Sequence, residues 1–227
     1  SSYILLSTIT DCSDAHIIPL SKDFDSTTSF TDVFNFAVLS FEFLIGMGII
    51  ANLDMFVKGA YFLEGKLEEE NIVLRKFSKE NYYNDLKKIY NISVVSFSKN
   101  PLYTPVSEEE FIKQYEPYIN MVDEDFILIA EKDGQEVGFL FCIPNFNELK
   151  LTGKLSTLIV KTIAVLPEYQ RLSLGSLMLN HVSKKAKNKN FENWIFAFMY
   201  SENSSQKMAK RNKTQVIREY ALYGKEI

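Results

Sequence analysis

The sequence is poor in the residue types that build cross-linked or metal-binding folds. Its 227 residues include only two cysteines and two histidines, which are Cys12, Cys142, His16 and His181. The cysteines stand far apart, and no pair of these residues has the spacing of metal ligands. We therefore expect no disulfide framework, no zinc and no other metal. This predicts a reducing, cytoplasmic environment in which both cysteines are small buried hydrophobic residues rather than nucleophiles.

Positive charge is also scarce. The chain carries 25 lysines and arginines against 29 acidic residues, a net charge of −4, with a pI near 5.4. Nucleic-acid-binding domains are usually basic, so we expect no nucleic-acid partner. A run of lysines at 184, 185, 187 and 189 is expected on the solvated last turn of a helix, where cations suit the helix dipole. The pattern G-x-x-x-x-G-K-[ST] is absent, which excludes a P-loop.

The sequence has no initiating methionine and no signal-peptide pattern, which suggests a processed chain or a piece of a longer one. Residues 34–51 form a long apolar run that approaches the length of a membrane span. Glu42 interrupts this run, two glycines follow Glu42 within the run, and flanking Lys or Arg residues are missing. We favour a buried helix and strand here and keep a membrane element as the alternative.

Apolar periodicity and turn signals predict an α/β (α+β) domain after residue 71. A Ser107–Glu110 capping box and an Asp133-Gly134 hairpin turn are its clearest local signals. The expected elements are a strand at 72–77, a helix at 79–92 capped by Ser78, a loop at 96–107, a helix from Ser107, strands at 125–131 and 136–143, a loop to Leu155, a strand to Val165, a helix to about Lys187, a strand at 193–200, a short helix after Asn203, and a strand at 215–227.

Residues 161–187 carry the most information about function. A β-branched strand is stopped by Pro167, and leucines then recur near helical spacing. The turn between strand and helix, QRLSLGS at 170–176, contains small residues that let the backbone approach a ligand closely. Amides at a helix N-terminus, with the helix dipole behind them, form an anion site suited to a pyrophosphate. An ordinary strand–loop–helix connection is the alternative interpretation.

This stretch resembles the acyl-CoA signature of the GNAT N-acyltransferase superfamily. That signature is Arg or Gln, two residues, Gly, one residue, then Gly or Ala, after a strand ending in V-x-P-x-Y. The matching residues are Val165, Pro167, Tyr169, Gln170 and Gly175, whereas Ser173 stands in place of the first glycine. If the family backbone needs a positive φ at that position, Ser173 would carry strain.

The resemblance covers roughly residues 71–227 and implies the GNAT acyl-CoA N-acyltransferase fold. This is a mixed central sheet with splayed parallel strands, flanked by helices. The stretches IYNISVVSF, VGFLFCIPNFN and REYALYGKE are similar to one bacterial branch of the superfamily. Residues 1–70 would form an N-terminal extension. It is either a degenerate GNAT-like half, suggested by FLIGMGI and GAYFLEGKL, or an unrelated helical segment.

The resemblance implies transfer of an acyl group, with acetyl expected, from acyl-CoA to a primary amine of a small molecule or protein. The alternative is a non-catalytic acyl-CoA-binding or sensor module. Backbone groups of the strand would bind the pantetheine arm, the turn would bind the pyrophosphate, and the Val165 amide would stabilise the oxyanion. The implied cofactor-binding residues are Ile163, Ala164, Val165, Gln170, Arg171, Leu172, Ser173, Leu174, Gly175, Ser176 and Asn203. Asn203 could equally be a helix N-cap.

The catalytic residues are less clearly indicated. Many family members use a tyrosine acid in the short helix after the asparagine, but this helix has none and places Lys210 near that position. Tyr220 and Tyr223 are the substitutes, with core packing as their alternative role. Glu202 is the candidate base or else a surface carboxylate, since the strand 157–165 contains no carboxylate. For the acceptor pocket we expect Phe97, Tyr103 and Asn145, which could instead serve turn packing and capping.

Overall fold

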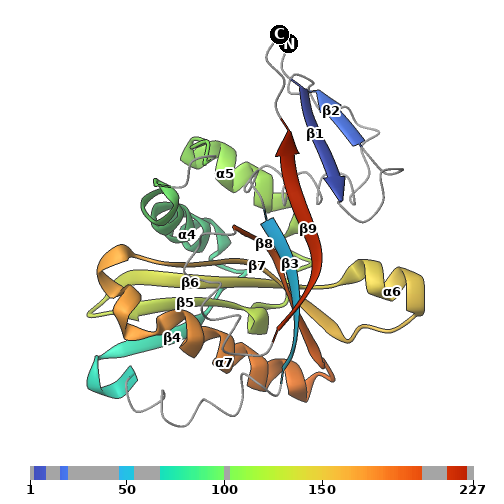
Figure 1. Ribbon diagram of the computed structural model, residues 1–227. Helices are drawn as coiled ribbons and strands as arrows, with labels where there is room; N and C mark the ends of the chain where they lie inside the picture. The colour runs from blue at the N-terminus through green and yellow to red at the C-terminus, as the bar shows by residue number, and fades with distance from the viewer. Residues whose placement is uncertain are drawn as a thin grey trace. The chain divides into compact units, whose positions relative to one another are not determined.

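The computed structural model describes residues 3–8, 16–19, 46–53, 67–99, 103–200 and 214–223 (Figure 1). The chain divides into two compact units. The first unit contains residues 1–50, 102–104 and 196–227, and the second contains residues 51–101 and 105–195. The turn at 170–176, which is the candidate anion site and is called the anion-site turn below, belongs entirely to the second unit.

A mixed five-stranded sheet organises the second unit. Its strands are β4 (Ile72–Lys76), β5 (Ile127–Lys132), β6 (Gln135–Pro144), β7 (Thr157–Val165) and the beginning of β8 (Asn193–Tyr200). The first four pair antiparallel in chain order. β8 begins beside β7, because the Ser156 carbonyl accepts from the amides of Glu192 at 2.7 Å and Asn193 at 3.1 Å. Since both strands start at the same point and a helix connects them, they run parallel. The GNAT fold expected from the sequence is confirmed.

Helices cover both faces of this sheet. In Figure 1, α4 (Tyr82–Phe97) and α5 (Glu108–Tyr115) lie on one face, and α7 (Leu174–Asn188) lies on the other. Strands β5 and β6 are buried on both faces, as their nearly continuous apolar sequences require. At the start of β8, Trp194 is fully buried and donates from Nε1 to Ser183 Oγ on α7 at 3.1 Å.

Two local signals in the sequence are confirmed. Ser107 accepts from the Glu110 amide, and the Glu110 side chain accepts from the Ser107 amide, which completes the capping box of α5. The hairpin between β5 and β6 turns at Asp133 and Gly134, with φ of 52° and 81°. Positive φ at both central residues matches the Asp-Gly preference of this turn.

The predicted start and end of the first helix are wrong. The N-cap of α4 is Asn81, not Ser78, and the helix runs on to Phe97 through the start of the expected loop. Ser78 instead holds the preceding turn: its amide donates to Asp85 Oδ2 at 2.9 Å, and its Oγ accepts from the Asn81 amide at 3.3 Å. Asp85 thus holds the turn before α4 in place, and its ion pair with Arg75 is described below.

The loop expected before β7 contains a helix, α6 (Phe146–Thr152). Asn145 caps it by accepting from the Glu148 amide, and Gly153 ends it with a φ of 70°. The Glu148 carboxylate also accepts from the amides of Ser156 at 3.1 Å and Thr157 at 2.9 Å. These bonds fix α6 to the first residues of β7.

The first unit contains β1 (Tyr3–Thr8), β2 (His16–Pro19), most of β3 (Gly46–Asn52) and β9 (Gln215–Tyr223). β1 pairs antiparallel with β2 and β9, and β9 also pairs antiparallel with β3. The end of the apolar run at 34–51 is thus a strand, while 34–45, the short helix after Asn203 and residues 224–227 lie outside the described residues. Among the residues that the structure describes, no helix has the length and apolar character needed to cross a membrane.

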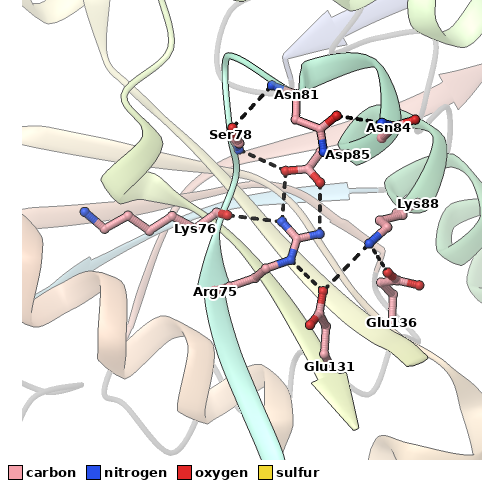
Figure 2. A network of polar contacts seen from close by, with 9 residues as sticks. All are labelled: Arg75, Lys76, Ser78, Asn81, Asn84, Asp85, Lys88, Glu131 and Glu136. Carbon is pink, nitrogen blue, oxygen red and sulfur yellow. Dashed lines mark hydrogen bonds and ion pairs between the residues drawn. The ribbon is translucent and has the colours of Figure 1, made fainter. Parts of the chain in front are cut away.

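An ion-pair network ties the edge strand β4 to α4 (Figure 2). The Arg75 guanidinium donates from both terminal nitrogens to Asp85, at 2.9 Å each, and from Nε to Glu131 at 2.5 Å. Lys88 extends the network by pairing with Glu131 and Glu136. The Asp85 side chain is only 2% exposed, so its charge depends on these partners.

Replacing Asp85 by alanine should lower the free energy of unfolding by about 3 kcal/mol, because it leaves Arg75 without its bidentate partner. The Arg75→Met/Asp85→Leu double variant should recover most of this loss, since it removes both charges. Urea denaturation of each variant measures the effect. Lys87→Ala breaks the exposed pair with Glu108 and should cost no more than about 0.5 kcal/mol. A loss for Asp85→Ala no larger than for Lys87→Ala would contradict the role assigned to Asp85.

A second cluster joins the end of α7 to the residues before β5. Lys189 Nζ lies 2.6 Å from Asp123 and 2.7 Å from Asp125, and 5.0 Å from the centre of the Phe126 ring. Lys76 also pairs with Asp125. The hydrogen bonds from Lys189 and Lys76 lower the pKa of Asp125 from 3.8 to about 2, against the opposing effect of burial.

Because the folded-state pKa of Asp125 is depressed, its contribution to stability is present above pH 3.8 and lost as the pH falls toward 2. Solvent screening should limit this contribution to about 1 kcal/mol. We expect the stability of the parent to fall more steeply between pH 4 and pH 2 than that of Asp125→Asn, as measured by thermal unfolding at closely spaced pH values. Parallel pH curves would show that the cluster does not act in this way.

Candidate functional site

The anion-site turn is built from a strand end, a short 3₁₀ helix and a long α-helix. β7 ends at Val165, the 3₁₀ helix η4 covers Pro167–Leu172, and α7 begins at Leu174. Proline at the first position of η4 suits a helical start, where no amide hydrogen is needed. The predicted order of strand, turn and helix is confirmed.

Ser173 joins the two helices in a left-handed conformation, with φ 60° and ψ 23°. Strain was expected at Ser173 if its φ is positive, and this condition is met. For a residue with a Cβ this conformation costs roughly 1–2 kcal/mol. The backbone of this turn therefore favours glycine, and the serine is accommodated at a cost.

Gly175 lies where α7 packs closely against β7. A Cβ at this position would lie 3.1 Å from Cδ1 and 3.8 Å from Cγ1 of Ile163. The neighbouring Leu174 is fully buried and anchors the first turn of α7. The glycine thus lets the helix N-terminus lie directly against the end of β7.

The electrostatics of this turn suit an anion. In α7, which is described over its whole length, the first turn contains no acidic residue, and the N-cap Ser173 makes no side-chain hydrogen bond to it. The first bond of the helix runs from the Leu177 amide to the Ser173 carbonyl at 3.1 Å, so the amides of Leu174 and Gly175 precede the helical ladder. Arg171 is exposed on the last turn of η4, and Gln170 Nε2 donates to the Val165 carbonyl at 3.2 Å.

The ladder between β6 and β7 determines which backbone groups of β7 can face a ligand. The Leu166 amide donates to the Val137 carbonyl at 2.9 Å, and Ala164 stands opposite Phe139. Bonding alternates along an antiparallel pair, so Ala164 directs its backbone groups toward β6, whereas those of Ile163 and Val165 point to the other edge. The expectation that all three residues offer unpaired groups is therefore wrong for Ala164.

A β-bulge interrupts β7 at Lys161. Phe141 pairs with Thr162 and the next residue, Cys142, pairs with Val160, so Lys161 is the extra residue. Its Nζ donates to Tyr115 Oη of α5 at 2.8 Å. The sequence analysis missed this pair, although a lysine within the apolar strand TLIVKTIAV was the available signal.

The other predicted site residues are spread over several elements. Phe97 ends α4, and Asn145 caps α6, which confirms its alternative role. Tyr103 belongs to the first unit. Tyr220 and Tyr223 lie on β9, where their backbones pair with Thr8 and Leu5, but their side chains lie outside the described residues, as do Glu202 and Asn203 entirely.

Cys142 is poorly placed to act as a nucleophile. It is almost fully buried on β6, and burial raises the pKa of its thiol well above the usual range. The prediction of a buried cysteine is confirmed at this position. Cys12 lies outside the described residues.

Solved structures with a similar fold include several acetyltransferases. A GCN5-related N-acetyltransferase from Sphaerobacter thermophilus matches with a TM-score of 0.58 and 16% identity over 87% of this chain and 57% of that chain. The glucosamine N-acetyltransferase region of a fungal multi-domain GH3 β-N-acetylglucosaminidase gives 0.57 and 11%, over 91% of this chain and 25% of that chain. An aminoglycoside acetyltransferase from an uncultured soil metagenomic sample, in complex with sisomicin, gives 0.50 and 14%, over 65% and 90%.

These identities show a shared fold, and the chain spans only about half or a quarter of the first two proteins' lengths. No curated protein matches the sequence. A model of the acetyltransferase (GNAT) family matches residues 86–212, which is more than half of the 227-residue chain and includes β7, the turn and α7. The chain therefore belongs to the acetyltransferase (GNAT) family.

Proposed function

We propose that the protein transfers an acetyl group from acetyl-CoA to a primary amine of a small molecule or protein. The observation that carries this proposal is the junction of β7 and α7, where Ser173 adopts a left-handed conformation and Gly175 brings the helix N-terminus against Ile163. This junction offers helix amides to a phosphate group directly beside a strand edge that can bind an extended chain. Both features are required to hold the two halves of CoA.

The residues of the turn fit the pyrophosphate of acetyl-CoA. Gln170, Arg171, Leu172, Ser173, Leu174, Gly175 and Ser176 would surround it, with the dipole of the 15-residue α7 behind it. The outward backbone groups of Ile163 and Val165 would bond the pantetheine arm, and Asn203 would contact the same arm. Ala164 contributes through its place in the strand, since its backbone groups face β6.

The proposed reaction is a direct transfer. The amine nitrogen attacks the thioester carbonyl carbon, the carbon–sulfur bond breaks, and the nitrogen loses a proton while the sulfur gains one. The Val165 amide would donate to the carbonyl oxygen as negative charge develops on it. For the proton transfers we propose Glu202 as base and Tyr220 or Tyr223 as acid.

The proposed acceptor is a small-molecule or protein amine. The similar structures include an aminoglycoside acetyltransferase and a glucosamine N-acetyltransferase region, which supports an amine acceptor in general terms. Phe97, Tyr103 and Asn145 remain the residues proposed to line its pocket. With a buried free Cys142 and few cysteines overall, we also propose that the protein works in the cytoplasm.

Acetyl-CoA should bind the parent protein, and Gly175→Glu should weaken this binding at least tenfold. The glutamate would place a negative charge among the first-turn amides and a Cβ 3.1 Å from Ile163 Cδ1. Calorimetric titration with acetyl-CoA measures both proteins. Equal affinities would contradict the placement of the pyrophosphate at this turn.

Two further variants separate charge from packing and strain. Gly175→Ala adds the same Cβ without charge and should keep most of the affinity, because the flexible end of Ile163 can shift. Ser173→Gly should raise the free energy of unfolding by about 1 kcal/mol by removing the strain of the left-handed serine. It should still bind acetyl-CoA.

A non-catalytic acyl-CoA sensor is the second candidate function. It is favoured by the strained Ser173 and by the absence of a carboxylate from β7, whose sequence is TLIVKTIAV. In an enzyme, Glu202→Gln or Tyr220→Phe should reduce kcat at least tenfold while leaving the affinity for acetyl-CoA within twofold. Steady-state assays of CoA release with an amine panel test this. If parent and variants bind acetyl-CoA equally and none releases CoA with any amine, the sensor is the better description.

A further inference from the structure

We infer that Tyr115 and Lys161 bind a carboxylate of the acceptor substrate and so select amines that carry an acidic group. This inference rests on the proposed acetyltransferase activity, and it assigns a substrate class to that activity. The pair joins α5 to β7 within the second unit, on the face of the sheet covered by α4 and α5.

The bulge brings Lys161 to this position. In a regular strand, residues 161 and 163 would point to the same face, and Ile163 lies against the first turn of α7. The extra residue in β7 breaks this alternation, and the Lys161 ammonium instead reaches Tyr115 of α5 on the opposite face. The chain thus places a cation at mid-strand that a regular strand would have directed toward α7.

The hydrogen bond between the two side chains has a fixed direction. An ammonium can only donate, so the Tyr115 oxygen accepts from Lys161 and its own hydrogen must point elsewhere. Among the described residues no acceptor for this hydroxyl hydrogen is found. The adjacent ammonium also polarises the hydroxyl and makes it a stronger donor. A carboxylate oxygen would satisfy this donor, and its negative charge would lie beside the Lys161 ammonium.

Aromatic rings surround the pair. Lys161 Nζ lies 4.9 Å from the centre of the Tyr115 ring and 5.7 Å from that of Phe141. The Tyr115 ring in turn packs 4.8 Å from Phe111 and 5.8 Å from Phe141. These rings fix the tyrosine and exclude part of the solvent, so a hydrogen bond from its hydroxyl to a charged group is screened less than at an open surface.

The pair lies close to the proposed reaction centre. Lys161 precedes Ile163 by two residues and Val165 by four on the same strand, about 7 Å and 13 Å along it. An amine attacking a thioester held at the end of β7 could therefore extend a carboxylate back to Tyr115. A second amine at that position would lie beside the Lys161 ammonium and the Tyr115 hydroxyl donor, and repulsion from the ammonium disfavours polycationic acceptors.

Matched acceptors that differ by one carboxylate test this inference. Suitable pairs are L-lysine and cadaverine, and 6-aminohexanoate and pentylamine, because a terminal amine in these compounds lies several ångströms from the carboxylate. We expect the parent to acetylate the carboxylate member with a kcat/KM at least tenfold higher. Tyr115→Phe should remove most of this preference through KM, and Lys161→Met should do the same, while Lys161→Arg retains part of it.

Tyr90→Phe is the matched control, because it removes a hydroxyl from the same aromatic row. Tyr90 Oη donates to the Val106 carbonyl at 3.0 Å, and its ring packs 5.4 Å from Phe111. This variant should keep the parent's preference. A preference in the parent that Tyr115→Phe leaves unchanged, or an equal loss of turnover for both members of each pair, would overturn the inference.

A binding measurement separates this inference from the proposed activity. Calorimetric titration with Nα-acetyl-L-lysine and with N-acetylcadaverine needs no turnover, and we expect only the first to bind and Tyr115→Phe to weaken it at least tenfold. Failure of both compounds to bind would overturn the carboxylate site even if acetyl-CoA binds. Failure of acetyl-CoA to bind, with Nα-acetyl-L-lysine bound through Tyr115, would instead contradict only the acetyltransferase activity.

Discussion

The pairing of β6 with β7 is the constraint on which the rest of the site depends. Its register turns the backbone groups of Ile163 and Val165 away from β6 and ends the ladder at the bond between Leu166 and Val137. The approach is close: a Cβ on Gly138 would lie 3.0 Å from the Ala164 carbonyl. Because η4 and α7 continue from the last residue of this ladder, the position of the anion site follows from the register of one strand pair.

Two departures from regular structure lie on or just after β7, and both are at positions that we propose bind substrates. The bulge at Lys161 redirects one side chain, and the left-handed Ser173 redirects the backbone into α7. Each costs stability locally, through a lost ladder bond or through steric strain. Strong packing elsewhere supports them, since Leu174, Met178 and Leu179 of α7 are fully buried against the sheet. A well-packed helix can hold a strained turn at its N-terminus.

Much of this architecture could be predicted from local sequence signals. The capping box at Ser107, the Asp-Gly hairpin and the strand–turn–helix at 161–187 each depend on neighbouring residues. The start of α4 could not be predicted in this way, because Arg75 and Glu131 are brought together by strand pairing and Asp85 then turns the chain before the helix. Likewise the bulge at Lys161 exists only relative to β6. The helix α6 could have been predicted in place of a loop, because Asn145 is a recognisable N-cap residue and Gly153 a recognisable C-terminal residue of a helix.

The charges along β7 suggest how one strand can serve both substrates. Its C-terminal end leads to helix amides that favour the phosphates of CoA, and its middle carries the Lys161 ammonium. A site for a polycationic acceptor would need a carboxylate near the middle of the strand, where it would attract the second cation. β7 contains no carboxylate. Both the Lys161 ammonium and the helix amides after its C-terminal end therefore favour negative groups. An acceptor that carries a carboxylate would therefore gain from the strand that we propose binds the acyl donor, whereas a polycation would be repelled by Lys161.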